Sequence, residues 1–396
     1  MKLRNQILAL VCVLAFIGLG FIYFRAWVVQ KPFGIILIVG DGLNSRTLAA
    51  ARLFRDGAGT KLTVQRMPNL AMLTNASFDY AVPDLAAASS AIATGEYVRN
   101  GDVSQTLTGS RLTTILDRAR EKGRAVGLVT NASLTRPGAA AFYGFGTVES
   151  SYLNQLVHAR LDVALGGGAG DFRGPEGEDL FPGVIEKGFA IIRTRSQLEN
   201  LGGFRDTPLL GVFAEESLPR ISSGALDARV PTLPDMVRRA IEFLQFNRSG
   251  YLLVVDASLI SELAQNNDSE GVLRETLLLD DAVETSIQYA GTDSLIVATG
   301  RLSTGGMAMN GYPLSQDHGM ALLGTNAEGI PAIVWGTGPN GPRSTDRQPS
   351  DPAAYYLPVA VNVADDIIAV GIGAGSEELR AYMHTTDIFD IVDRQL

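Results

Sequence analysis

The sequence predicts an α/β fold with a central, mostly parallel sheet and helices on both of its faces. Short apolar segments recur along the chain, and amphipathic helical patterns lead into several of them. Strands that are apolar on both sides are typical of parallel sheets covered on both faces, and the alternation with helices supplies the crossovers. A length of 396 residues, 46% of them hydrophobic and 19% charged, excludes a disordered chain and a multi-span membrane protein.

The predicted elements follow one another along the chain. The first strand, residues 34–40, ends at Asp41. The later ones are helix 112–122 with strand 126–130, strand 162–168, helix 233–246 with strand 251–256, helix 268–289 with strand 294–299, and the apolar segments 331–335 and 366–371. Two Gly/Pro-rich segments, near 170–188 and 338–357, are predicted surface insertions.

Residues 7–24 form an unbroken apolar segment with Lys2 and Arg4 before it and Arg25 after it. This length predicts a single N-terminal transmembrane helix, and a cleaved signal peptide is the alternative. Residues 1–33 would then be an anchor or signal peptide with a short linker, and residues 34–396 the folded domain. The short N-terminal tail favours a periplasmic or extracellular location for that domain.

Charge and cysteine content limit the partners. The net charge is −9 and becomes −13 without residues 1–33, which hold four basic residues and no acidic one. This acidity argues against nucleic acid as a partner. The only cysteine, Cys12, lies in the apolar N-terminal segment, so the chain has neither an internal disulfide nor a cysteine-based metal site.

Residues 84–95 read as the N-terminus of a helix rich in small residues. Pro83 precedes it, and Asp84 can accept hydrogen bonds from the free N–H groups. Such an end can bind an anion facing Leu85, although a tightly packed core helix is the simpler interpretation. The segment resembles the nucleophile motif of the alkaline phosphatases, D-S-A-A-S-A-T-A-x-A-T-G. Leu85 stands where that family has its phosphate-accepting serine.

Further segments of residues 34–396 resemble the same family. They are Thr114-Ile115-Leu116 with Gly127-Leu128-Val129-Thr130, Ala140-Ala141-Phe142-Tyr143, 162–168, 209–214, Thr304-Gly305-Gly306, 336–339 and Thr386-Asp387-Ile388-Phe389. The resemblance implies the fold of that family and a reaction that uses a serine, two zinc ions, a magnesium ion and a phosphate-binding arginine. Zinc would activate the nucleophile and stabilise the leaving oxygen.

Most positions that the resemblance assigns to this chemistry hold other residues here. Asp41 is kept, and Asp256 replaces the magnesium glutamate. The magnesium threonine falls on Gly138 or Arg136, depending on the alignment, and the phosphate arginine falls near Glu149. The zinc positions fall on Ser261, Gln265, Arg301, Leu302 and Ala327, and none of the three histidines, His158, His318 and His384, falls on a ligand position.

These joint losses predict a membrane-anchored, catalytically inactive pseudoenzyme that acts as a binding or scaffold module for an unidentified partner. Two alternatives stay open, a metal-dependent phosphomonoester hydrolase with an altered site and a structural component of an envelope assembly. No cofactor is expected. The residual pair Asp41 and Asp256 suits weakly bound magnesium or calcium, and zinc is not expected.

Charge makes a further prediction. Asp41, Asp84 and Asp256 would converge at the carboxyl edge of the sheet and repel one another without metal ions. We expect Arg301 to pair with Asp41 or Asp84, and Arg136 to lie near Asp256 or Asp41, in place of the missing cations. The alternative is that both arginines face solvent. Ser89, one turn after Leu85, is expected to face packing and not to replace the nucleophile.

Overall fold

The computed structural model describes residues 2–23, 33–57, 59–148, 152–202, 207–221, 228–310, 319–326, 328–343 and 354–396. The chain divides into two compact units, Met1–Pro32 and Phe33–Leu396. Four of the residues named above lie outside the described part of the chain, namely Arg25, Glu149, His318 and Ala327.

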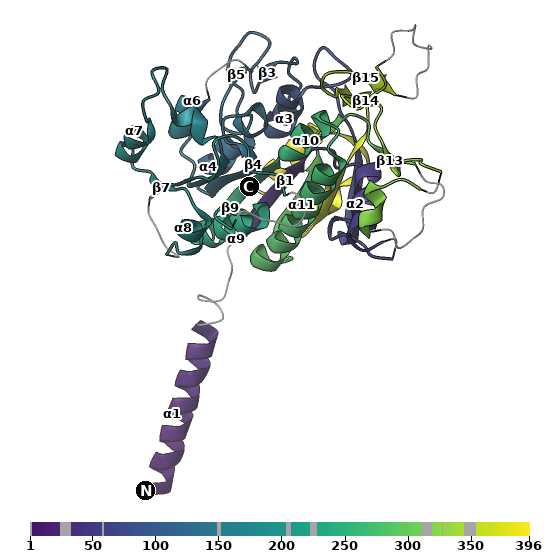
Figure 1. Ribbon diagram of the computed structural model, residues 1–396. Coiled ribbons are helices and arrows are strands. Elements are labelled where there is room, and N and C mark those ends of the chain that lie inside the picture. Colours follow the sequence, from purple (N-terminus) through teal and green to yellow (C-terminus); the bar gives the residue numbers. More distant parts are fainter. Residues whose placement is uncertain are drawn as a thin grey trace. The chain divides into compact units, whose positions relative to one another are not determined.

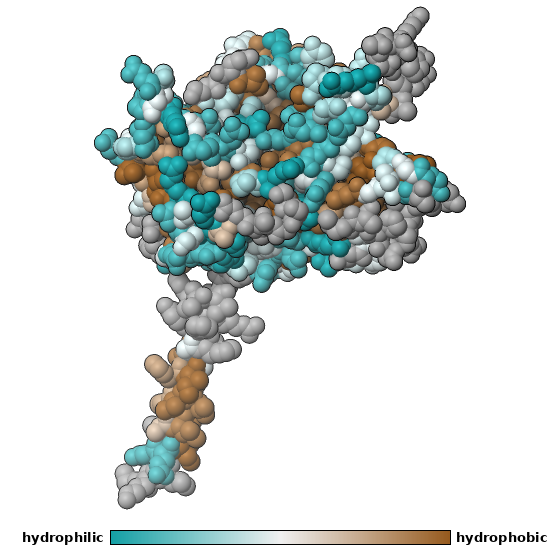
Figure 2. All heavy atoms as spheres, in the orientation of Figure 1, coloured by the Kyte–Doolittle hydropathy of each residue, from teal (hydrophilic) through white to brown (hydrophobic). Residues whose placement is uncertain are grey.

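The N-terminal unit contains α1 (Lys2–Tyr23), whose apolar side chains are exposed along the helix (Figure 2). Among the described residues, none of the helices combines the length and the apolarity needed to cross a bilayer. The transmembrane helix predicted over residues 7–24 is therefore not found.

The larger unit is built on a ten-stranded sheet (Figure 1). Its strands, in spatial order, are β18 (Arg380–His384), β2 (Asn69–Thr74), β17 (Ile367–Ile372), β10 (Leu295–Gly300), β1 (Gly34–Gly40), β9 (Tyr251–Ala257), β4 (Ala125–Ser133), β6 (Val163–Gly167), β8 (Leu209–Val212) and β7 (Ala190–Ile192). β17 alone runs antiparallel to its neighbours in this order, β10 and β2. The predicted central, mostly parallel sheet is confirmed.

Helices cover both faces of the sheet (Figure 1). Alternate residues of β1 explain this, since Ile36 and Ile38 pack into one core and Ile35, Leu37 and Val39 into the other. The first core is covered by α2 (Ser45–Asp56), α8 (Arg195–Glu199), α9 (Leu233–Leu244), α10 (Leu259–Gln265) and α11 (Ser269–Ala290). The second is covered by α3 (Leu85–Thr94), α4 (Ile115–Glu121), α5 (Pro137–Ala140), α6 (Leu153–His158), α7 (Phe181–Glu186) and α12 (Asp387–Asp393).

Short elements lie outside the main sheet. The described residues form four further pairs of two-residue strands, which are β3 (Asp102–Val103) with β5 (Gly146–Thr147), β11 (Ser303–Thr304) with β16 (Asn362–Val363), β12 (Ala308–Met309) with β13 (Ile333–Val334), and β14 (Thr337–Gly338) with β15 (Tyr355–Tyr356). Short 3₁₀ helices are η2 (Val64–Arg66), η3 (Ala169–Phe172), η4 (Gly319–Leu323) and η5 (Ser376–Glu378). Of the apolar segment 331–335, only Ile333–Val334 forms a strand, β13, and it pairs with β12 outside the main sheet.

The register of the central strands aligns their carboxyl ends. In the β1–β9 ladder Val39 lies opposite Asp256, and in the β1–β10 ladder Gly40 lies opposite Gly300. Asp41 and Arg301 are therefore the residues that directly follow two adjacent parallel strands. In the β4–β9 ladder Thr130 lies opposite Asp256. The fold thus brings polar side chains from four neighbouring strands to one edge of the sheet.

Candidate functional site

Arg301 occupies the centre of the candidate site. Its side chain is fully buried, and it is among the largest fully buried side chains in the described part of the chain. Its Nε donates to Asp41 Oδ1 at 2.8 Å, and its Nη2 lies 2.7 Å from the same oxygen. Its Nη1 lies 2.8 Å from Asp256 Oδ1. One guanidinium therefore bridges two buried carboxylates that belong to adjacent strands.

Two serines complete the contacts of the guanidinium. Nη1 donates to Ser89 Oγ at 3.0 Å, and Nη2 donates to Ser258 Oγ at 2.8 Å. Together with the carboxylate contacts, Nε has one close oxygen and each terminal nitrogen has two. The guanidinium is therefore surrounded by oxygen atoms of the protein itself.

Hydroxyl groups hold the other oxygens of the two carboxylates. Ser261 donates to Asp41 Oδ2 at 2.5 Å, and Thr130 donates to Asp256 Oδ2 at 2.7 Å. Ser258 lies within 2.8 Å of both oxygens of Asp256. All four carboxylate oxygens therefore accept hydrogen bonds, so burial of these groups leaves none of them unpaired.

The charges of this cluster do not balance when both aspartates are ionised, since one guanidinium then faces two carboxylates. Burial raises the pKa of Asp41 to about 6, Asp256 adds to the rise, and Arg301 and Ser261 oppose it. For Arg301, burial lowers the pKa, but Asp41 and Asp256 outweigh burial and raise it above its usual value. The cluster is electrically neutral when Asp41 carries a proton and has one negative charge when it does not.

This titration predicts a pH-dependent stability. Asp41 holds its proton up to about pH 6 when folded, against 3.8 as an ordinary side chain. Its contribution to stability is therefore fully present below about pH 4 and is lost as the pH rises through 6. The loss amounts to about 3 kcal/mol. We expect the difference in urea unfolding free energy between the wild type and Asp41→Asn to change by this order between pH 4 and pH 8. A pH-independent difference would contradict the assignment.

Helix α3 contacts Arg301 through the side chain of Ser89 and not through its N-cap residue, Asp84. Asp84 caps α3 and accepts from the backbone N–H groups of Ala87 at 2.8 Å and Gly101 at 2.6 Å. Ser89 Oγ donates to Leu85 O at 2.5 Å while it accepts from Arg301. The expectation that Ser89 only faces packing is therefore wrong, because a helix turn places it directly over the guanidinium. Leu85, at the first position of α3, brings no polar side-chain atom to this turn.

Gly138 leaves the space that the cluster fills. A Cβ at this position would lie 2.4 Å from Ser258 Oγ, 3.2 Å from Arg301 Nη1 and 3.3 Å from Asp256 Oδ1. The first distance is shorter than real Cβ contacts allow, so any side chain here would have to displace part of the network. Glycine is needed at this position for space.

Arg136 does not provide a second positive charge beside Asp41 and Asp256. It precedes α5 with an extended backbone, and its guanidinium pairs with Glu262. Its side chain is 45% exposed. Among the described ion pairs it has none with Asp41 or Asp256, so the expectation that it lies beside them is corrected. Of the two partners expected for Arg301, the structure provides Asp41 and not Asp84, and it adds Asp256.

The donor set does not fit a metal ion. Arg301 lies between the two retained carboxylates, and a cation would have to displace a positive charge that is already hydrogen-bonded there. His158 is exposed and contacts Asn154 O and Lys187, while His384 contacts Thr74 and Tyr97. In the part of the chain that the structure describes, no three His, Cys, Asp or Glu side chains are grouped to hold a metal.

Three hydroxyl groups of the site, those of Ser89, Thr130 and Ser258, were not identified as site residues from the sequence. The signal for two of them was present, because Thr130 ends a predicted strand and Ser258 lies two residues after Asp256. Strand ends in a parallel sheet meet at one edge, which makes such residues candidates. Ser89 could not be found this way, since its role depends on where the long side chain of Arg301 points.

Comparisons with known proteins agree with this fold. A family profile described as alkaline phosphatase matches residues 34–334. The chain is 27% identical to alkaline phosphatase 4 of Bacillus subtilis over 306 residues, which are 73% of this chain and 65% of that protein. It is 29% identical to alkaline phosphatase 3 of the same organism over 293 residues, or 69% of this chain and 62% of that protein. These matches span slightly less than two thirds of the Bacillus proteins.

Solved structures show the same similarity in three dimensions. A cold-active alkaline phosphatase from a psychrophilic Shewanella species superimposes with a TM-score of 0.74 at 21% identity, covering 92% of this chain and 99% of that one. The Thermus thermophilus alkaline phosphatase gives a TM-score of 0.73 at 21% identity, covering 93% of this chain and 92% of that one. These structures share the fold, and the family profile covers most of the chain. The chain therefore belongs to the alkaline phosphatase family.

Proposed function

We propose that this chain is a catalytically inactive member of its family that serves as a binding or scaffold module. The observation that carries the proposal is the buried guanidinium of Arg301, bonded to both Asp41 and Asp256. Phosphoryl transfer depends on a nucleophile and on positive groups that remain free to stabilise the transferred phosphoryl oxygens. In this chain the positively charged guanidinium of Arg301 is already paired with the carboxylates of Asp41 and Asp256.

The position of the nucleophile supports the same proposal. Leu85 has no atom that can attack phosphorus, and it begins the helix where the resemblance places the serine. The hydroxyl of Ser89 is already used twice, as donor to Leu85 O and as acceptor from Arg301. A serine beside an arginine and without a general base lacks the activation that nucleophilic catalysis needs.

A phosphomonoester hydrolase with an altered site is the second candidate. It is favoured by the relatives, which include alkaline phosphatases and a streptomycin-6-phosphate phosphatase of Streptomyces griseus that is 29% identical over 314 residues. Family membership by itself favours this activity over inactivity. The site geometry favours inactivity, so the two candidates differ in a directly measurable outcome. Membrane anchoring, an extracytoplasmic location and a role in an envelope assembly stay predictions.

We expect the purified chain to show no turnover of p-nitrophenyl phosphate above buffer in the presence of zinc and magnesium. The reason is the combined lack of a nucleophile at Leu85 and of free positive charge at Arg301. The Leu85→Ser variant should also be inactive, because a restored hydroxyl still meets an engaged guanidinium. The measurement is initial rate against substrate concentration, with an active alkaline phosphatase as the positive control.

Two outcomes would favour the hydrolase instead. One is turnover that copurifies with the protein and disappears in Asp41→Asn while the circular dichroism spectrum is unchanged. The other is stoichiometric zinc or magnesium in the dialysed protein, measured by elemental analysis. Activity that is unaffected by Asp41→Asn would point to a contaminant and leave the inactive assignment in place.

A further inference from the structure

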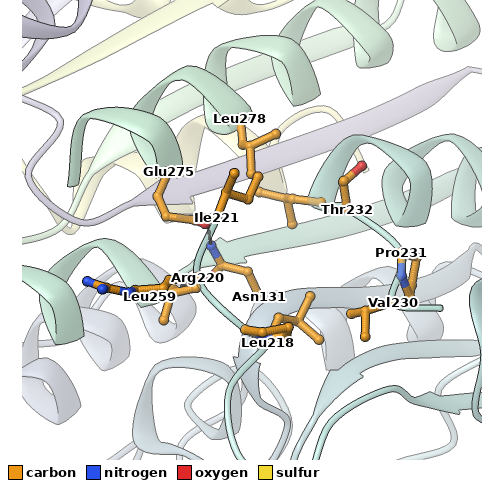
Figure 3. Close-up of a pocket in the computed structure, with 12 residues that line it drawn as sticks. Asn131, Leu218, Arg220, Ile221, Val230, Pro231, Thr232, Leu259, Glu275 and Leu278 are labelled. Carbon is orange, nitrogen blue, oxygen red and sulfur yellow. Dashed lines mark hydrogen bonds between the residues drawn. The ribbon is translucent and has the colours of Figure 1, made fainter. Parts of the chain in front are cut away.

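A cavity of about 110 Å³ is lined by parts of β4, α9, α10 and α11 and by the segment after β8 (Figure 3). Its wall is largely apolar, with Leu218, Val230, Leu259 and Leu278 among the lining residues. A dry cavity of about 150 Å³ can hold a benzene molecule, so this space suits a ligand of about five non-hydrogen atoms.

One carboxyl group faces this apolar space. Glu275, on α11, is 2% exposed and lines the cavity. Its Oε2 accepts from Asn131 Nδ2 at 3.0 Å, and among the described residues it has no other hydrogen bond and no ion pair. The Oδ1 of the same asparagine accepts from the backbone N–H of Leu259 at 3.1 Å, which fixes the orientation of the Asn131 amide. Glu275 Oε1 is left for a group inside the cavity.

Charged side chains on the elements around the cavity form ion pairs with residues other than Glu275. They pair as follows: Arg220 with Asp268, Asp235 of α9 with Arg195, Glu262 of α10 with Arg136, Arg274 of α11 with Glu270, and Asp280 of α11 with Arg55. β4 carries no titratable side chain. Glu275 is therefore a buried carboxylate for which the described residues provide no cation.

We propose that this cavity binds a small primary ammonium ion with an aliphatic tail, whose NH₃⁺ group pairs with the carboxylate of Glu275. An ionised carboxylate in apolar surroundings is costly unless it is paired, and an ammonium group supplies both the charge and the hydrogen-bond donors. The apolar wall would hold the tail. This inference is independent of whether the chain hydrolyses phosphate esters.

The pKa of the carboxyl group gives the proposal a measurable signature. Burial raises the pKa of Glu275 to about 7, and the hydrogen bond from Asn131 opposes the rise. Binding of an ammonium ion requires the ionised form. Its affinity should therefore be constant between about pH 8 and pH 9, where the ligand keeps its own proton, and should fall about tenfold per pH unit well below 7. A neutral ligand of the same shape would show no such decline.

The test is titration of the full chain with n-butylammonium chloride, followed by calorimetry and by thermal unfolding at pH 8. Sodium chloride at equal ionic strength and n-butanol are the controls. We expect saturable binding and a rise in melting temperature with butylammonium only. Glu275→Gln should abolish both effects, whereas Glu284→Gln, an exposed position on the same helix, should leave them unchanged.

A second variant protects the test against loss of folding in Glu275→Gln. Leu278→Trp adds volume at the cavity wall and leaves the carboxyl group intact, so it should also abolish butylammonium binding. Binding that persists in either folded variant would overturn the proposal. So would an equal response to n-butanol, or an affinity that does not change between pH 5 and pH 8.

Discussion

The Arg301→Ala variant is expected to lose about 3–5 kcal/mol of unfolding free energy at pH 7. The substitution removes the only cation bonded to Asp41 and Asp256 among the described ion pairs, and both carboxyl groups are at most 1% exposed. The carboxyl groups of Asp41 and Asp256 would then be buried without a cation, and they must repel each other or take up protons. Urea unfolding followed by circular dichroism measures the loss.

An exposed arginine provides the matched control. Arg173 pairs with Glu215, and the two side chains are 63% and 61% exposed. Arg173→Ala should therefore change the unfolding free energy by less than about 1 kcal/mol. Arg301→Lys should fall between the two, because it keeps the charge and loses the planar fork. If Arg301→Ala unfolds at the same urea concentration as the wild type, the guanidinium does not carry the role assigned to it.

The Gly138→Thr variant is expected to be destabilised by about 3 kcal/mol, at the upper end of the usual cost of overpacking a buried site. The new Cβ would lie 2.4 Å from Ser258 Oγ, and the branched side chain extends beyond it towards Arg301. The network must then give up at least one of its hydrogen bonds. Chemical denaturation again measures the effect.

Two comparisons make this prediction specific to the cluster. Gly183 in α7 has no atom within 4 Å of an added Cβ, so Gly183→Ala should be neutral or slightly stabilising. The cost of Gly138→Thr should shrink in an Arg301→Ala background, since the smaller residue vacates the space. A double-mutant cycle measures this coupling, and equal costs in both backgrounds would show that Gly138 and Arg301 do not compete for space.

The first strand of the site was predictable because its cause is local. Residues 34–40 are apolar at every position and stop at Asp41, and the observed strand has these bounds. Where an observed helix boundary differs from the predicted one, the cause can also be local. The helix predicted from residue 112 begins at Ile115, because Thr114 and Asp117 form a reciprocal cap there.

The two arginines show where prediction from sequence stops. Arg301 directly follows the central strand β10, which fixes its backbone at the carboxyl edge of the sheet. Its side chain is buried there against Asp41 and Asp256. Arg136 precedes a helix of four residues, where a long side chain can reach the surface and pair with Glu262. No periodicity in the sequence distinguishes these two situations. They depend on which neighbouring element closes over each side chain.

The steric role of Gly138 constrains how this protein can evolve. A threonine at that position, one of the changes that the resemblance would require for magnesium, collides with Ser258 while the arginine network is present. An aspartate at position 301, introduced first, would bring a third carboxyl group to Asp41 and Asp256 without a cation. Either of these two substitutions, made first, therefore gives a destabilised protein. The packing around Arg301 thus opposes its own replacement, and this would hold in descendants of the chain even without selection on a function of the arginine.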